Sequence, residues 1–298
     1  MRRSAKVNLT IIQVHARIEV QASRLGYASM NPPRPTTLSR AVRILVTPES
    51  SPPAKEGFHN TFAGYPSSSE LGAWFEIEVS VAGMPDPSTG YLATLAQLDK
   101  SVRDSIVFLL RNELFHKSDG RRARPAALIH AMAETVSRSL GRPIETLKWN
   151  LSPYHILTWS RTMPASTTLC AIFEFAASHR LNDPNRSPVE NREFFGKCNK
   201  LNGHGHNYRL EVGIEVPAQS AFGMAQLEEI VDRTVIERFD HMNLNIDCPE
   251  FHHVNPSVEH IAAVCFEILE EPLKAGGALL KRVRLWETSK TSATVESQ

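Results

Sequence analysis

Cysteine is scarce in this chain, and so are long apolar runs and an excess of charge of either sign. The four cysteines stand far apart and form no Cys-x-x-Cys pair: Cys170, Cys198, Cys248 and Cys265. This spacing argues against a disulfide framework and favours a reducing compartment. The 33 Lys and Arg nearly balance the 32 Asp and Glu, so no overall field attracts a nucleic acid or an anionic membrane.

No stretch is apolar for long enough to predict a transmembrane helix, and the basic first residues lead into no uninterrupted apolar run of the signal-peptide kind. We therefore expect a soluble, cytoplasmic protein. The 298 residues are 42% hydrophobic and 22% charged. That composition is ordinary for a globular protein, and the length fits either one large domain or two smaller ones.

Two stretches lack regular patterning and divide the chain. Residues 31–70 are rich in Pro and Ser and are interrupted only by the strand-like AVRILV, and residues 160–168 form a short connector. The parts on either side of the connector show the same order of elements, which indicates an internal duplication. We predict one domain over residues 1–160 and a second over residues 169–298.

The C-terminal half predicts strands at LCAIFEFAAS, HNYRLEVGIEV and KRVRLWET, with two helices between the second and third. The first helix places apolar residues on one face: Leu227, Ile230, Val231, Val235 and Phe239. The second begins after Asn255-Pro256-Ser257, where a proline in the first turn fits the missing donor. Its apolar stripe is Val258, Ile261, Ala262, Cys265 and Leu269.

The N-terminal half predicts the same kinds of element from WFEIEVSV, ETLKWNL and YHILTWS as strands. Its first helix has an apolar face of Leu95, Leu98, Val102, Ile106 and Leu109, and Pro125 opens the second helix. Strands before and after a helix pair predict an α+β fold in which an antiparallel sheet carries helices on one face. We expect two copies of this unit.

The densest chemical signal lies in FEFAASHRL and in FGKCNKLNGHGHNY, which follows it. Residues two apart on a strand share a face, so His204 and His206 can point into one site, and His179 can complete a trio. Three neutral imidazoles with an open fourth position describe a catalytic zinc. A His-x-His on its own is more typical of ordinary surface histidines, but here it belongs to a longer phrase.

The motifs SHRL, ENREFFGKCN, GHGHNY and FDHMNLN, followed by a Glu after a closing strand, occur in that order. Over residues 170–298 the chain resembles the 6-pyruvoyl- and 6-carboxy-tetrahydropterin synthases. The resemblance implies a T-fold (ββααββ) and Zn²⁺ held by the histidine trio. It further implies a catalytic triad of Cys198, Asp240 and His241, a pterin anchor at Glu287, and loss of triphosphate from 7,8-dihydroneopterin triphosphate.

These implied roles agree with the chemistry of the residues. Lys197 and the expected zinc would both lower the pKa of the Cys198 thiol and favour the thiolate that abstracts a proton. Asp240 can orient the imidazole of His241, which then transfers protons. The Glu287 carboxylate offers two acceptors side by side, which match a ring N–H and a neighbouring amine of a pterin.

Further binding residues are predicted with less specificity. Glu259 and Ser257 match the family's position at the start of the second helix and are expected to help hold the pterin, although the helix dipole alone also explains an acid there. Cations are needed for the triphosphate. The candidates for that role are Lys197, Lys200 and Arg192.

Three readings of the activity stay open. The product can be the pyruvoyl compound or the carboxy compound used towards queuosine, and the five residues between Cys198 and His204 favour the pyruvoyl type. A second reading is another T-fold enzyme of pterin metabolism, such as a cyclohydrolase or an aldolase. A third is a pterin-binding protein without turnover.

The N-terminal half lacks the residues that carry this chemistry. Aligning the two halves sets Leu71 and Ala73 opposite His204 and His206, and RIEVQASRL opposite FEFAASHRL. We therefore expect a degenerate T-fold repeat without a metal. The resemblance also implies ring-shaped homo-oligomers with shared sites, and we expect three chains whose C-terminal halves form one ring and whose N-terminal halves form another.

Overall fold

The fold is described from a computed structural model. It covers residues 34–48, 59–60, 64–66, 71–116 and 123–298. Contacts divide the chain into a unit of residues 1–37 with 82–92 and a larger unit of residues 38–81 with 93–298. Within the part that is described, no helix is both long and apolar enough to cross a membrane.

The elements before the connector are β1 (Thr36–Val46), β2 (His59–Asn60), β3 (Tyr65–Pro66), β4 (Ala73–Gly83), α2 (Leu95–Arg111), η2 (Asn112–His116), α3 (Pro125–Leu140), β5 (Thr146–Asn150) and β6 (His155–Ser160). The elements after it are β7 (Ser166–His179), α4 (Pro188–Phe195), η3 (Gly196–Asn199), β8 (His204–Pro217), α5 (Met224–Val231), η4 (Asp232–Ile236), α6 (Glu237–Phe239), β9 (Met242–Asn243), α7 (Leu244–Asp247), η5 (Pro249–Phe251), α8 (Val258–Ala275), β10 (Leu279–Thr288) and β11 (Thr291–Glu296).

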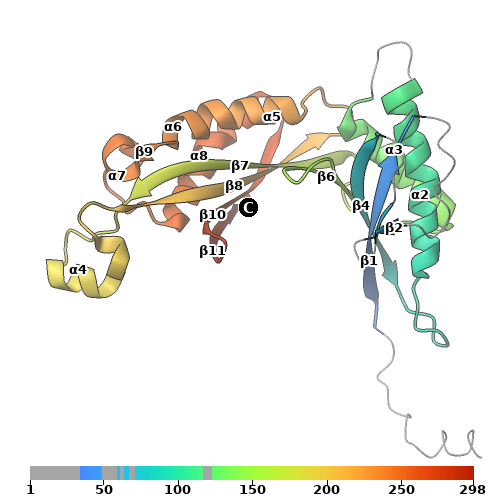
Figure 1. Cartoon of the computed structure of the whole chain (residues 1–298), viewed down its shortest axis with the longest axis horizontal. Coiled ribbons are helices and arrows are strands. Elements are labelled where there is room, and N and C mark those ends of the chain that lie inside the picture. The colour runs from blue at the N-terminus through green and yellow to red at the C-terminus, as the bar shows by residue number, and fades with distance from the viewer. Residues whose placement is uncertain (1–33, 49–58, 61–63, 67–70, 117–122) are drawn as a thin grey trace, which may run out of the picture. The chain divides into compact units, whose positions relative to one another are not determined.

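One sheet runs through the larger unit in the order β1-β4-β5-β6-β7-β8-β10-β11, and β9 adds to β7 in parallel. Every neighbouring pair from β4 to β11 is antiparallel. The α+β class and the antiparallel sheet are therefore confirmed. Helices α5 and α8 lie along one face of β7, β8 and β10, and α4 projects beyond the strand ends (Figure 1).

Alternation along the strands builds the core beneath these helices. Phe175 and Ala177 on β7, Tyr208 and Leu210 on β8, and Leu285 on β10 are all buried, because every second side chain faces the helices. The predicted helix faces are largely confirmed: Leu227, Val231, Val235 and Phe239 are buried, as are Val258, Ile261, Ala262, Cys265 and Leu269. On α2 the buried stripe is Leu98, Val102, Ile106 and Leu110, whereas Leu95 is exposed.

The first strand of the sheet differs from the expectation. Alignment of the halves placed RIEVQASRL in that position, but those residues lie outside the described part. The strand beside β4 is β1, Thr36–Val46, which includes the AVRILV run inside the stretch predicted to be irregular. Its alternation of buried Val42, Ile44 and Val46 explains why it is a strand.

In the smaller unit, a turn is organised by one carboxylate. Asp86 Oδ1 accepts hydrogen bonds from the N–H groups of Ser88 and Thr89 at 3.0 and 2.8 Å and from both hydroxyls. These bonds, led by that of the Ser88 hydroxyl, lower the pKa of Asp86 to about 2. The turn closes at Gly90, whose φ of 72° suits glycine.

Phe239 closes the core next to the predicted site. Its ring is fully buried, with centroids 6.3 Å from Phe175 and 5.8 Å from Phe251. We expect Phe239→Ala to lower the free energy of unfolding by about 3–5 kcal/mol, because it removes a large side chain and leaves a cavity. Phe108→Ala, at a site that is 62% exposed, is the matched control and should change stability by less than about 0.5 kcal/mol. Denaturant unfolding monitored by circular dichroism measures both, and equal effects would contradict the packing argument.

Candidate active site

Three histidines meet where β7 and β8 run side by side. In the antiparallel register His179 lies opposite His204, and Ala177 lies opposite His206. His204 and His206 therefore point to the same face as His179, since they are two residues apart on one strand. The ring centroids lie 4.6, 5.1 and 4.7 Å apart. Among the described residues this trio forms a cluster with one ligand atom from each ring, all within 4.8 Å.

The loop before α8 sets the proton position on His179. Its Nδ1 lies 2.6 Å from the carbonyl oxygen of Pro256 and must donate to it, which leaves Nε2 as a lone-pair donor to a metal. The sequence had placed Pro256 in the first turn of the helix. In the structure Ser257 is the N-cap of α8 and Pro256 precedes it, so this proline supplies a carbonyl oxygen to the site.

The trio fits a divalent metal. His179 Nε2 and His204 Nε2 lie 3.2 Å apart. Two nitrogens bound to a tetrahedral metal by bonds of about 2.0–2.1 Å are separated by a similar distance, ~3.3 Å. His206 Nε2 is buried and lacks a hydrogen-bond partner. Burial is the main cause that lowers the pKa of all three imidazoles. Neutral rings with free lone pairs are the form that binds zinc.

Glu287 joins this cluster from the end of β10. Its Oε1 lies 3.4 Å from His179 Nε2 and 3.5 Å from His206 Nε2. A break in register between Trp286 and Thr288 falls at this residue, and such irregularities redirect side chains near sites. The carboxylate is thus placed beside the atoms that would hold a metal.

Cys198 lies in η3 on the loop that leads into β8. Its backbone carbonyl accepts a hydrogen bond from Leu181 N–H at 2.9 Å, and the thiol is half-buried. Burial, and then the charge of Glu287, raise the pKa of this thiol. The sequence had predicted a lowered pKa because of Lys197 and a bound zinc. The Lys197 side chain is exposed, and among the residues of the chain it is the Glu287 carboxylate whose charge acts on the thiol. The effect of a bound zinc on this pKa stays a prediction.

Asp240 and His241 form a pair at the edge of β7. Asp240 Oδ1 accepts Ala176 N–H at 2.8 Å, and its Oδ2 lies 2.7 Å from His241 Nδ1. The Ala176 bond is the main cause that lowers the pKa of Asp240. His241 donates its own N–H to Ala176 O at 2.6 Å and has a φ of 60°. Its side chain is 83% exposed. The backbone and Nδ1 of His241 are therefore held by hydrogen bonds, while the rest of the imidazole is open to solvent.

The structure therefore groups the predicted residues into two sets. His179, His204 and His206 form one cluster, Glu287 contacts His179 and His206, and the charge of Glu287 acts on Cys198. The Asp240–His241 pair contacts the backbone of Ala176, and His241 lines a hollow of about 380 Å³ together with His206. The described contacts do not join the thiol of Cys198 to this pair.

Ser257 and Glu259 lie at the start of α8. Ser257 accepts the N–H of His260 at 3.4 Å as the N-cap. A bond from Ser257 is the main cause that lowers the pKa of Glu259, which is itself exposed. Helix capping explains this local pairing. Both residues closely follow Pro256, whose carbonyl oxygen orients His179.

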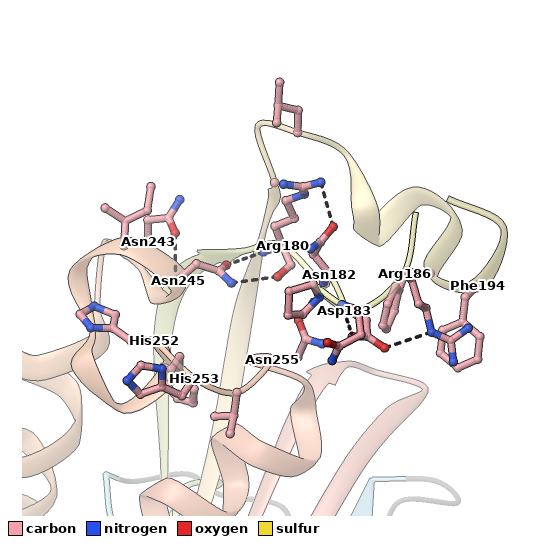
Figure 2. A pocket seen from close by; sticks show the side chains of 18 of the residues that line it. Arg180, Asn182, Asp183, Arg186, Phe194, Asn243, Asn245, His252, His253 and Asn255 are labelled. Atoms are coloured by element: carbon pink, nitrogen blue, oxygen red, sulfur yellow. Dashed lines mark hydrogen bonds and ion pairs between the residues drawn. The ribbon is translucent and has the colours of Figure 1, made fainter. Parts of the chain in front are cut away.

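A cavity of about 970 Å³, lined by residues that neighbour the trio in the sequence, was not predicted. Its lining includes Arg180, which follows His179, and Gly203, which precedes His204. Figure 2 shows the polar network on its wall. Asn245 accepts the N–H of Arg180 at 2.7 Å and donates to its carbonyl at 2.9 Å, while Asn255 accepts the N–H of Asn182 at 2.7 Å.

Two arginines, Arg180 and Arg186, line this cavity. Arg186 lies 3.1 Å from Asp183 and 4.3 Å above the ring of Phe194, and Arg180 donates to Asn182 at 3.1 Å. The expected Lys197, Lys200 and Arg192 are exposed and do not line the cavity. The SHRL motif contains Arg180, so its position beside His179 was the available signal.

Comparison with known proteins gives a consistent result. Residues 168–298 match the family model described as 6-pyruvoyl tetrahydropterin synthase. A 6-pyruvoyl tetrahydrobiopterin synthase of Homo sapiens is 37% identical over 118 residues, which are 38% of this chain and 80% of that protein. One of Drosophila melanogaster is 37% identical over 120 residues, 39% of this chain and 71% of that protein. The solved Caenorhabditis elegans 6-pyruvoyl tetrahydropterin synthase shares 32% identity over 45% of this chain and 96% of its own, with a TM-score of 0.41.

Proposed function

Because the chain belongs to the 6-pyruvoyl tetrahydropterin synthase family, we propose that residues 169–298 form a zinc-dependent lyase acting on 7,8-dihydroneopterin triphosphate. The observation that carries the proposal is the histidine trio, in which His179 is buried and the other two are half-buried, with Glu287 in contact and Cys198 close enough to be affected by its charge. A structural zinc site would close its fourth position with another protein ligand, whereas three histidines leave a position for substrate.

In this proposal His179, His204 and His206 hold the zinc. A bound zinc would supply Lewis acidity towards a side-chain hydroxyl of the substrate. The hydrogen bond from His179 to Pro256 fixes one ligand ring, and burial lowers the pKa of all three rings, which favours their neutral form. The residues of the chain then have to bind the pterin and move protons.

Cys198 accepts a proton from the substrate side chain, and the His241 imidazole donates or accepts one elsewhere on it. Asp240 holds His241 by its Nδ1, so Nε2 is the nitrogen that exchanges protons. Since His241 is open to solvent and forms a separate group from Cys198, the complete site is proposed to require a neighbouring half or chain.

Glu287 is proposed to anchor the pterin, with Ser257 and Glu259 as secondary contacts. We expect Glu287→Gln to retain zinc but raise KM about 10- to 100-fold, because an ionised acceptor contributes about 1.5–3 kcal/mol to a hydrogen bond. Steady-state kinetics and metal analysis test this role, with Glu193→Gln on the exposed surface of α4 as the matched control. Loss of zinc together with activity would instead show that Glu287 acts on the metal.

The decisive experiment for the function is product analysis. Purified protein loaded with zinc is incubated with 7,8-dihydroneopterin triphosphate, and released triphosphate and the pterin product are measured. We expect triphosphate and 6-pyruvoyl-tetrahydropterin. The carboxy compound would assign the other branch of the family, and absence of turnover by folded, zinc-loaded protein would reject the enzyme proposal.

The N-terminal half is proposed to be a degenerate copy of the same unit. The order β1-β4-β5-β6 repeats in β7-β8-β10-β11, and each half has its two main helices between its second and third strands. Each first helix also ends in a π-helical turn, η2 or η4. Ala73, at the start of β4, cannot bind a metal, so this half serves as a scaffold.

A further inference from the structure

One buried side chain beside the histidine trio has a polar group without a partner. Tyr208 lies on β8, two residues after His206, and it is fully buried. Within the part of the chain that is described, its hydroxyl makes no hydrogen bond. A buried hydroxyl without a partner is unfavourable, because it has lost its bonds to water and gained none in return. Native structures pair almost all such groups, so a ligand-dependent partner is expected here.

Packing fixes the ring of Tyr208, so its hydroxyl has little freedom to find a partner elsewhere. The ring stacks on Phe175, with centroids 5.1 Å apart and an angle of 19° between the planes. It meets the rings of His206 and His179 edge to face, with centroids 5.6 and 6.3 Å away. Tyr208 is therefore in contact with both the core and the predicted metal ligands.

The neighbouring strand brings Glu287 to the same place. In the antiparallel register of β8 and β10, Leu285 lies opposite Leu210, and both are buried. Glu287 comes two residues later on β10, and Tyr208 comes two residues earlier on β8. Since side chains two apart share a face, both point to the face of this leucine pair. Residues directly opposite on such strands have Cβ atoms about 5 Å apart.

Glu287 lacks the donor that Tyr208 can supply. Its Oε1 lies 3.4 Å from His179 Nε2 and 3.5 Å from His206 Nε2. On a neutral His179 that nitrogen carries a lone pair, because Nδ1 donates to Pro256. The same Nε2 atoms are the predicted metal ligands, and a metal-bound nitrogen offers no proton to a carboxylate. Glu287 is therefore an acceptor that needs a donor, and Tyr208 is a donor that needs an acceptor.

Two groups lie within electrostatic reach of the tyrosine hydroxyl. Burial, and then the charges of Glu287 and Cys198, raise the pKa of Tyr208. The hydroxyl therefore keeps its proton and remains a donor. Of the two groups the carboxylate is the stronger acceptor, because sulfur accepts hydrogen bonds only weakly. Glu287 is thus the better partner for this hydroxyl.

We propose that Tyr208 is a positioning residue whose hydroxyl donates a hydrogen bond to the Glu287 carboxylate when the site is occupied by metal and pterin. This bond orients the carboxylate, so that its remaining lone pairs face the ring N–H and the amine of the pterin. The role rests on the proposed function, because the ligand is the pterin that Glu287 is proposed to anchor. An unpaired hydroxyl in the free protein costs stability and prepares the site for its ligand.

Tyr208→Phe tests this role, because it removes only the hydroxyl and keeps the ring. In the metal-free protein its melting temperature should equal or exceed that of the wild type, since the lost group had no partner. The matched control is Tyr154→Phe, at a side chain that is 47% exposed, which should change neither stability nor kinetics. A fall of several degrees in Tyr208→Phe alone would overturn the proposal, because the hydroxyl would already have a partner in the free protein.

The zinc-loaded protein provides the second measurement. Tyr208→Phe should keep its zinc and raise KM for 7,8-dihydroneopterin triphosphate about 10-fold, the effect of one hydrogen bond to a charged group. Its kcat should stay within about twofold of the wild type, because the bond serves ground-state and transition-state binding alike. The Kd of neopterin, measured by its fluorescence, should rise by the same factor without any turnover.

A double-mutant cycle separates action through Glu287 from direct contact with the ligand. In a Glu287→Ala background, Tyr208→Phe should change KM and the neopterin Kd by less than about twofold, because the acceptor is gone. Equal factors in both backgrounds would overturn the proposal, as would unchanged KM and Kd in the single variant. A wild type that releases no triphosphate would count against the proposed function instead, and neopterin binding would still decide the role of Tyr208.

Discussion

Cys198→Ala is expected to lower kcat by about 10²- to 10⁴-fold, the usual contribution of a positioned acid or base. The substitution removes the proposed proton acceptor and no metal ligand. Zinc content and melting temperature should therefore stay close to those of the wild type, and KM should change little because the thiol contributes mainly in the transition state. Stopped assays of triphosphate release measure the loss.

The matched control for this prediction is Cys248→Ala. Cys248 is buried, and its Sγ lies 3.8 Å from the carbonyl oxygen of Arg238, so it has a structural environment and no proposed part in catalysis. This variant should keep kcat and lose some stability. Wild-type turnover in Cys198→Ala would remove the cysteine from the mechanism.

The double variant His204→Ala, His206→Ala is expected to lose nearly all bound zinc and all measurable activity. Only His179 would remain of the trio, and one imidazole does not hold zinc at ordinary concentrations. The wild type should contain about one zinc per chain, since the trio is the one three-residue histidine cluster in the described part. Metal analysis by mass spectrometry gives both values directly.

A matched control for the double variant uses two histidines outside the trio. His252 and His253 are adjacent and exposed, and replacing both by alanine should leave zinc content unchanged. Two zinc equivalents in the wild type, or full zinc content in the His204→Ala, His206→Ala protein, would refute the assignment of the trio.

Local patterns explain how much of the structure was predictable. The alternation that identified β7 and β8 also placed His204 and His206 on one face, because both follow from the two-residue period of a strand. The apolar faces of α5 to α6 and of α8 followed from helical spacing. Predictions that depended on neighbours in sequence were therefore mostly correct.

Features set by distant residues were not predictable in this way. The pKa of Cys198 rises partly through Glu287, whose strand is far along the chain. Asn245 organises Arg180 from 65 positions away, and no local pattern indicates such a bond. The pairing of β6 with β7 joined the halves in one sheet, whereas element order alone was also compatible with halves placed in different rings.

His241 has a left-handed backbone conformation that is unfavourable for a residue with a side chain. A φ of 60° is easily adopted by glycine but costs other residues about 1 kcal/mol or more. We expect His241→Gly to be about 1 kcal/mol more stable than His241→Ala in denaturant unfolding, because both lose the imidazole and only glycine relieves the backbone. Equal stabilities would show that the conformation is unstrained. If the difference is found, histidine at position 241 costs the fold stability that glycine would retain, as expected of a residue kept for the proton transfer proposed above.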